Sequence, residues 1–193
     1  HSADQAATAA REVGLPVVLK VESPDIPHKT EAGVIRLNLK TEGEVRQAFA
    51  DVMRNAQAAT PSARITGVLV QPMVPQGTEI MVGARVDPQF GPMVVVGLGG
   101  IFVELLKDTT VRLAPVGIPQ ARKMLGELKA QAALNGFRGA PPVDRERLAE
   151  VIARISEFAS DQRDRIAELD VNPLICAGER IIAVDALIAK PQA

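Results

Sequence analysis

The chain has 193 residues, of which 47% are hydrophobic and 23% charged, and this composition excludes a disordered or fibrous protein. Its 22 basic and 23 acidic residues give a formal net charge of −1, with no basic stripe and no Trp or Tyr, which argues against nucleic-acid binding. The single cysteine, Cys176, excludes an internal disulfide and a cysteine-only metal site, and this fits a reducing cytoplasm.

The sequence predicts neither a membrane span nor a secretory leader. The longest uncharged stretch, 88–103, is interrupted by Pro92 and by glycines, and it is shorter than the roughly 20 apolar residues that cross a bilayer. The start, HSADQ, has neither a basic nor an apolar region. Because the chain begins with His1 rather than Met, we expect a tag remnant or an excised fragment.

The first part of the chain predicts a helix, two strands and a second helix. A helix from Ala3 stops at Gly14, a continuously apolar strand covers 16–21, a second strand covers 34–39, and a helix covers 42–59. Thr41 and Glu44 match a capping box at the start of the second helix. The polar segment 23–33 between the strands is expected to be a loop.

The rest of the chain predicts strands, two helices and two more strands. The strands are expected over 65–71, 78–86, 93–97 and 111–114, the helices over 119–133 and 145–159, and the last strands over 166–171 and 181–187. Residues 87–91 are expected to form a hairpin turn, and 136–142 a mobile connector. This order indicates a mixed α+β fold rather than regular βαβ alternation.

Lys20 is the first candidate for chemistry, because it closes a buried strand. A lysine at a strand end can bind phosphate as a point charge. The alternative, which position alone favours, is a lysine whose ammonium group reaches solvent beyond the strand.

His28 is the second candidate, because it lies in the polar loop beside Asp25, Lys29 and Glu31 rather than in a core. Such a histidine can act as a nucleophile that forms a covalent intermediate. In isolation, a solvated loop residue is the simpler interpretation. A metal site on His28 is disfavoured because the chain has no second internal histidine.

Oxygen-bearing side chains near strands form the third group: Glu79, Glu104, Asp170, Asn172 and Asp185. Asn172 and Asp185 would suit Mg²⁺, which takes oxygen ligands and keeps substrate phosphates in its shell. The alternatives are an ion pair between Asp185 and Arg180, and a turn at Asn172-Pro173.

The glycines of 97–100 form the fourth candidate. Gly99 and Gly100 would let backbone N–H groups approach a phosphate closely. The segment is neither a Walker loop nor a dinucleotide fingerprint, and by itself it could be a flexible hairpin. A lysine near a strand end together with two oxygen ligands is nevertheless the set that a nucleoside triphosphate site needs.

Taken together, these segments resemble the ATP-grasp domain of the NDP-forming acyl-CoA synthetases. The ADP-forming acetyl-CoA synthetase is the type member, and the β subunit of succinyl-CoA synthetase is a more distant relative. The resemblance covers about 6–189 and is carried by GLPVVLKVESPDIPHKTEAGV, GTEIMVGARVDPQFGPMVVVGLGGIFVELLKD, RLAP, and AELDVNPLIC with AVDAL. It implies two α+β lobes, approximately 1–70 and 71–193, with a nucleotide cleft between them.

The resemblance also implies roles for individual residues. It assigns Lys20 to the nucleotide phosphates, the connector with Gln71, Met73 and Val74 to the adenine, and Glu79 to the ribose and phosphates. It assigns Asn172 and Asp185 to Mg²⁺, His28 to transient phosphorylation, and Glu104 and Asp170 to acidic positions near the site where the phosphohistidine docks. The implied cofactors are ATP or ADP and Mg²⁺.

The implied reaction converts acyl-CoA, ADP and phosphate into the free acid, CoA and ATP. The implied partners are the CoA-binding and ligase domains of the same enzyme, so this segment alone is not expected to turn over acyl-CoA. The family usually shows a helix and an extended segment before the point where this chain begins, so we expect part of the nucleotide lobe to lie outside this sequence. A second departure is Ala32, which stands where a glycine is common.

Two alternatives to this function are a non-catalytic, synthetase-like regulatory region of a protein-lysine acetyltransferase, and an interaction module that has lost nucleotide binding. Regulatory regions of the first kind tend to lose the phosphorylated histidine. The presence of His28 together with Lys20, Asn172 and Asp185 therefore favours an active phosphotransfer domain.

Overall fold

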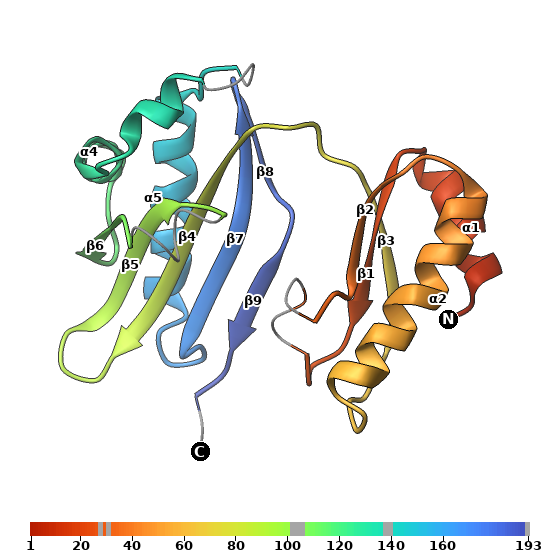
Figure 1. The fold of residues 1–193 in the computed structure, drawn as a ribbon. Coiled ribbons are helices and arrows are strands. Elements are labelled where there is room, and N and C mark those ends of the chain that lie inside the picture. The colour runs from red at the N-terminus through yellow and green to blue at the C-terminus, as the bar shows by residue number, and fades with distance from the viewer. Residues whose placement is uncertain (27–28, 30–31, 101–106, 137–140, 192–193) are drawn as a thin grey trace. The chain divides into compact units, whose positions relative to one another are not determined.

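A computed structural model describes residues 1–26, 29, 32–100, 107–136 and 141–191. The chain divides into two compact units, which we call unit 1 (His1–Met73) and unit 2 (Val74–Ala193) (Figure 1). Both units combine helices with antiparallel sheet, so the expected mixed α+β class is confirmed. Within the described part of the chain, no helix is long and apolar enough to cross a membrane.

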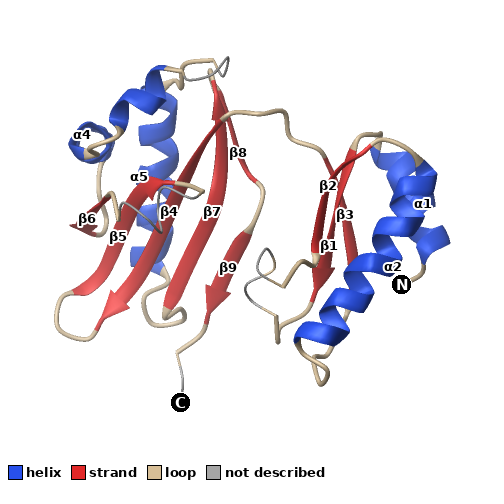
Figure 2. Ribbon diagram, viewed as in Figure 1, coloured by secondary structure: helices blue, strands red, loops and turns tan. Residues whose placement is uncertain are grey.

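Unit 1 is a three-stranded antiparallel sheet with two helices on one face (Figure 2). Strand β1 (Val17–Glu22) lies between β2 (Ile35–Leu39) and β3 (Gly67–Pro72). The helices are α1 (Ala3–Val13) and α2 (Glu42–Ala59). Alternate β1 residues pack against them: Val17 and Leu19 join a core with alanines of α1 and with Val45 of α2.

Local sequence signals fix the helix ends in unit 1. The Thr41 side chain accepts from the backbone N–H of Glu44, and the Glu44 carboxylate accepts from the N–H of Thr41, so the predicted capping box is confirmed. Helix α1 ends at Gly14, whose φ of +93° is a conformation that glycine adopts without strain. The predicted helices and strands of unit 1 are all present, with ends displaced by one or two residues.

Unit 2 is a six-stranded sheet covered on one face by helices α4 and α5 (Figure 2). The strand order is β6-β5-β4-β7-β8, and β9 pairs with β7 beside β8. The elements are β4 (Thr78–Asp87), β5 (Gly91–Leu98), β6 (Thr109–Leu113), α4 (Ile118–Glu127), the 3₁₀ helix η1 (Gln131–Asn135), α5 (Arg145–Asp161), β7 (Glu168–Ala177), β8 (Arg180–Ala183) and β9 (Ala186–Ala189).

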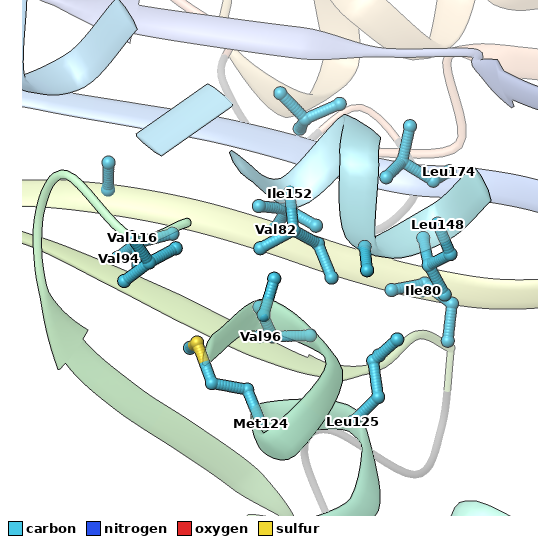
Figure 3. Packing of buried hydrophobic residues seen from close by; sticks show 14 of the residues in the cluster. Ile80, Val82, Val94, Val96, Val116, Met124, Leu125, Leu148, Ile152 and Leu174 are labelled. Atoms are coloured by element: carbon cyan, nitrogen blue, oxygen red, sulfur yellow. The ribbon is translucent and has the colours of Figure 1, made fainter. Parts of the chain in front are cut away.

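The core of unit 2 forms between the sheet and the two helices. Figure 3 shows Ile80 and Val82 of β4 facing Leu148 and Ile152 of α5. The buried face of α5 comprises Leu148, Ala149, Ile152, Ser156 and Ala159. Phe158 lies outside this face: the residue is 43% exposed, because the buried stripe passes through Ser156 and Ala159.

The predicted helix over 119–133 is too long, because α4 ends at Glu127 and η1 follows separately. The cause is a tertiary contact. The buried carboxylate of Asp108 accepts from the backbone N–H groups of Lys129 and Ala130, at 2.9 and 2.8 Å. Those bonds turn the chain out of the helix, and Leu128 takes an extended conformation.

The carboxy-terminal strands also differ from the prediction. Strand β7 runs through Asn172-Pro173 rather than ending there, because the pairing with β4 shifts so that both residues lie opposite Met81. Such a bulge tolerates a proline, which has no N–H to donate. The strand expected over 181–187 is two strands, β8 and β9, and Asp185 lies in the interruption between them.

The predicted hairpin turn at 87–91 is confirmed. Asp87 pairs with Gly91, and the Asp87 carboxylate accepts from the N–H groups of Gln89 and Phe90. These two bonds lower the pKa of Asp87, since they stabilise its charged form. The expected mobile connector, 136–142, lies mostly outside the described residues.

Candidate functional site

In unit 1, Lys20 lies on the sheet face opposite α1 and α2. Its neighbours in β1, Leu19 and Val21, point into the helix-covered cores, and side chains alternate along a strand. Lys20 is buried and pairs with Ile35 of β2 and Leu69 of β3. It therefore does not close the strand, as the sequence suggested, but lies within it on the central strand of the sheet.

Gln71 shares this face with Lys20. It pairs with Val18 of β1, two residues from Lys20, while Val70 packs on the helix side. The next two expected adenine-binding positions follow β3 directly. The Met73 N–H donates to the Pro16 carbonyl (3.0 Å), which holds the chain against the start of β1, and Val74 is the first residue of unit 2.

In unit 2, Glu79 lies on the sheet face away from α4 and α5, because its neighbour Ile80 is in the core. The Gly99 N–H donates to the Glu79 carbonyl at 2.6 Å. A Cβ atom on Gly99 would lie 2.8 Å from the Glu79 Cβ, and one on Gly100 would lie 2.9 Å from the Glu79 carboxylate. Only glycines leave room for Glu79 here, so the structure brings these three expected site residues together.

Three further candidates come together where β7 faces the interruption between β8 and β9 (Figure 1). The Asn172 N–H donates to the Asp185 carbonyl at 3.2 Å. The Asn172 side chain lies close enough to the Asp170 carboxylate to stabilise its charged form, and the Asp185 carboxylate lies close enough to Asp170 to interact with its charge. The Asp185 carboxylate also accepts from the Ala186 N–H at 3.1 Å.

Burial and neighbouring charge raise the pKa of Asp170 above its usual value. Burial of the half-buried carboxyl is the largest cause, and the charge of Glu168 adds to it. The hydrogen bond from Asn172 acts in the opposite direction, and Asp185 contributes a smaller increase. Glu168 was not among the predicted candidates, although its spacing of two residues from Asp170 in a strand already places both on one face.

The donor set at this point fits Mg²⁺. The Asn172 side chain supplies an amide oxygen that can act as a ligand, and Asp185 adds a carboxylate. The described residues contain no cluster of three His, Cys, Asp or Glu side chains that would hold a metal by themselves.

Two expected site residues, His28 and Glu104, lie outside the described residues. Of the other candidates, Lys20 and Gln71 share one sheet face in unit 1, and Met73 and Val74 follow β3 at the boundary of the two units. The sheet of unit 2 carries two clusters, Glu79 with Gly99 and Gly100, and Asp170 with Asn172 and Asp185.

Comparison with known proteins shows the family. A family model described as an ATP-grasp domain matches residues 1–189. The chain is 44% identical over 183 residues to the β subunit of ADP-forming acetate–CoA ligase I of Pyrococcus furiosus, covering 95% of this chain and 78% of the relative. It is 43% identical over 171 residues to the ADP-forming 4-hydroxybutyrate–CoA ligase of Nitrosopumilus maritimus, covering 89% of this chain and 24% of that protein.

Solved structures agree with this relationship. A dinucleotide-forming acetyl-coenzyme A synthetase 1 of Ca. Korarchaeum cryptofilum, in complex with coenzyme A and Ca-AMPCP, matches with a TM-score of 0.92 at 42% identity, covering 98% of this chain and 82% of that chain. A second structure of that enzyme holds coenzyme A and Mg-AMPPCP, with a phosphohistidine segment pointing towards the nucleotide binding site. It matches with a TM-score of 0.81 at 39% identity, covering 97% and 82% of the two chains. The chain therefore belongs to the ATP-grasp domains of the ADP-forming acyl-CoA synthetases, and the expected fold class is confirmed.

Proposed function

We propose that this domain binds Mg-ADP or Mg-ATP and passes a phosphoryl group between a phosphohistidine and the nucleotide. It does so as part of an ADP-forming acyl-CoA synthetase that converts acyl-CoA, ADP and phosphate into acid, CoA and ATP. The observation that carries this proposal is the convergence of Asn172, Asp185 and Asp170 at one point of unit 2, in a chain of this family.

The oxygen cluster of unit 2 is proposed to hold the cation that accompanies the nucleotide. The Asn172 amide oxygen and the Asp185 carboxylate would be the protein ligands, and Mg²⁺ bound there offsets the charge on the nucleotide phosphates. Asp170, whose charged form the neighbouring Asn172 side chain stabilises, is proposed to orient the Asn172 amide. Glu79, held beside Gly99 and Gly100, is proposed to contact the ribose and phosphates.

Unit 1, with Val74 and Glu104 of unit 2, is proposed to supply the remaining nucleotide contacts and the phosphoryl carrier. Lys20 would neutralise phosphate charge, and Gln71, Met73 and Val74 would meet the adenine, largely through the backbone. His28 would accept the phosphoryl group on a ring nitrogen, and Glu104 would lie near the docked phosphohistidine. Dividing the transfer into two steps lets each step occur between groups held close together.

The partners in this proposal are the CoA-binding and ligase domains of the same enzyme, on the same chain or on a partner subunit. One relative described above is a subunit, and another is a chain of which this domain covers only 24%. Both are ligases, which favours the enzyme over the regulatory alternative. The proposed compartment is the cytoplasm, in keeping with the single cysteine.

The test is ATP formation by the complete enzyme that contains this domain, assayed with acetyl-CoA, ADP, phosphate and Mg²⁺. We expect ATP from the wild type and a loss of that activity in His28→Gln and in Asp185→Asn, but not in Glu179→Gln. Glu179 is an exposed acid in the turn between β7 and β8 and loses the same charge. A wild-type enzyme that binds Mg-ADP but forms no ATP would support the regulatory alternative instead.

A further inference from the structure

Both ends of the segment that carries His28 are fixed to the body of unit 1. At the first end, the Asp25 N–H donates to the Ser23 hydroxyl (3.1 Å), and the Asp25 carboxylate accepts from the N–H of Arg64 (2.7 Å), a residue distant in sequence. Ile26 is buried in a core with Val52 of α2. The chain is therefore fixed as far as Ile26.

At the second end, the carbonyl of Gly33 is the anchor. It accepts from the side-chain nitrogen Nδ2 of Asn55 at 2.8 Å and from the guanidinium of Arg36 at 2.9 Å. Val34 is fully buried, its N–H donates to the Lys29 carbonyl (3.1 Å), and its own carbonyl accepts from Val21 in β1 (3.0 Å). The chain is thus fixed again from Gly33 onward.

Asn55 differs from Arg36 and Val34 because it lies in a distant element, helix α2, and donates from there to the Gly33 carbonyl. It is in α2, between Val52 and Ala56, which are both buried in the core that contains Ile26 and Val34. Its amide group also closely approaches Gly33: a Cβ on Gly33 would lie 3.1 Å from Nδ2, and the φ of Gly33 is +64°. A neutral hydrogen-bond donor at position 55 and a glycine at 33 therefore fit each other.

We propose that Asn55 is a positioning residue for phosphoryl transfer: it holds the Gly33 carbonyl and thereby fixes the carboxy-terminal end of the segment that carries His28. This inference rests on the proposed function of His28. Transfer to a histidine depends steeply on the position of the reacting atoms, so a released anchor slows the transfer without altering nucleotide contacts made elsewhere.

The test compares Asn55→Asp with Gln57→Glu in the complete enzyme. Both changes convert an amide to a carboxylate on α2, but Gln57 is exposed and only Asn55 bonds to Gly33. In Asn55→Asp the amide donor is lost and a carboxylate faces the Gly33 carbonyl.

We expect acid-labile phosphorylation by saturating Mg-ATP to slow by roughly ten- to a hundredfold in Asn55→Asp, with an unchanged KM for Mg-ATP. Gln57→Glu should behave like the wild type, and Asn55→Gln, which keeps a donor, should recover part of the rate.

A second readout does not depend on phosphorylation. Cleavage after Lys29 by a lysine-specific protease should be faster in Asn55→Asp than in the wild type or Gln57→Glu, because the Gly33 carbonyl keeps Arg36 but loses its donor from α2. Unchanged cleavage and an unchanged phosphorylation rate in Asn55→Asp would overturn the positioning role, as would a KM that rises in parallel with the loss of rate. A wild type that never carries phosphate would overturn the proposed function itself, while faster cleavage would still report the anchor.

Discussion

The backbone N–H of Asn172 donates to the carbonyl of Asp185, at 3.2 Å, where the edge of the six-stranded sheet passes from β8 to β9. On the other side of the interruption, the Val184 N–H donates to the Pro173 carbonyl at 3.1 Å. The backbones of the two proposed Mg²⁺ ligands are therefore held relative to each other by main-chain bonds, so little backbone freedom remains to be lost when a cation binds.

Removing the proposed carboxylate ligand should weaken Mg-ADP binding. A charge-assisted interaction contributes about 1.5–3 kcal/mol, so Asp185→Asn should raise the Kd for Mg-ADP by roughly ten- to a hundredfold. Isothermal titration with and without Mg²⁺ measures this, and the affinity for ADP in EDTA should be the same in variant and wild type. Glu179→Gln is the control for lost charge. An Mg-ADP affinity unaffected by Asp185→Asn would remove Asp185 from the cation site.

A methyl group at position 99 should disturb Glu79. In Gly99→Ala the new Cβ would lie 2.8–3.1 Å from the Cβ, carbonyl carbon and carbonyl oxygen of Glu79, so the backbone has to shift. We expect a loss of about 1–3 kcal/mol in the free energy of unfolding, together with weaker nucleotide binding. Denaturant unfolding measures the first effect. Gly126→Ala in α4 is the matched control: nothing lies within 4 Å of its Cβ, and alanine there should stabilise the helix.

The carboxylate of Asp108 should matter for stability although it has no proposed role in catalysis. Asp108→Ala leaves the N–H groups of Lys129 and Ala130 without their acceptor, and we expect a loss of roughly 2–4 kcal/mol in the free energy of unfolding. Chemical denaturation provides the measurement. If the variant were as stable as the wild type, the contact would not explain why α4 ends at Glu127.

The hairpin turn should become less stable in acid through Asp87. Its folded pKa is lowered, so its carboxylate stabilises the fold above the unfolded pKa, and that contribution is lost as the pH falls through the folded pKa. Asp87→Ala should therefore lower the Tm at neutral pH, and its difference from the wild type should shrink in acid. Thermal unfolding across this range tests the sign. Gln89→Ala, in the same turn, should show a pH-independent difference.

The features that were predicted from sequence depend on residues close together in the chain. Thr41 and Glu44 form a capping box within one helical turn, Gly14 ends α1 locally, and Asp87 and Gly91 bound the predicted hairpin turn. In such patterns, the residues that determine the local structure all lie within the pattern itself.

The features that were predicted wrongly depend on residues far apart. Helix α4 ends because of Asp108, which precedes the bonded N–H groups by more than twenty residues. The strand over 181–187 is divided because β7 bulges at Asn172-Pro173, and that bulge is set by the register against β4. The candidate site is a further example. Its oxygen-bearing residues were identified from their residue type, but the place where they come together depends on the pairing register of the sheet.

The most direct test of the account is acid-labile phosphorylation of the complete enzyme by Mg-ATP, read by intact mass and ³¹P NMR, in the wild type and in His28→Gln. We predict phosphate on His28 of the wild type that passes to added ADP, and no phosphate at this position in the variant. The result that would contradict this account is a wild type that makes ATP from acyl-CoA while His28 never carries phosphate.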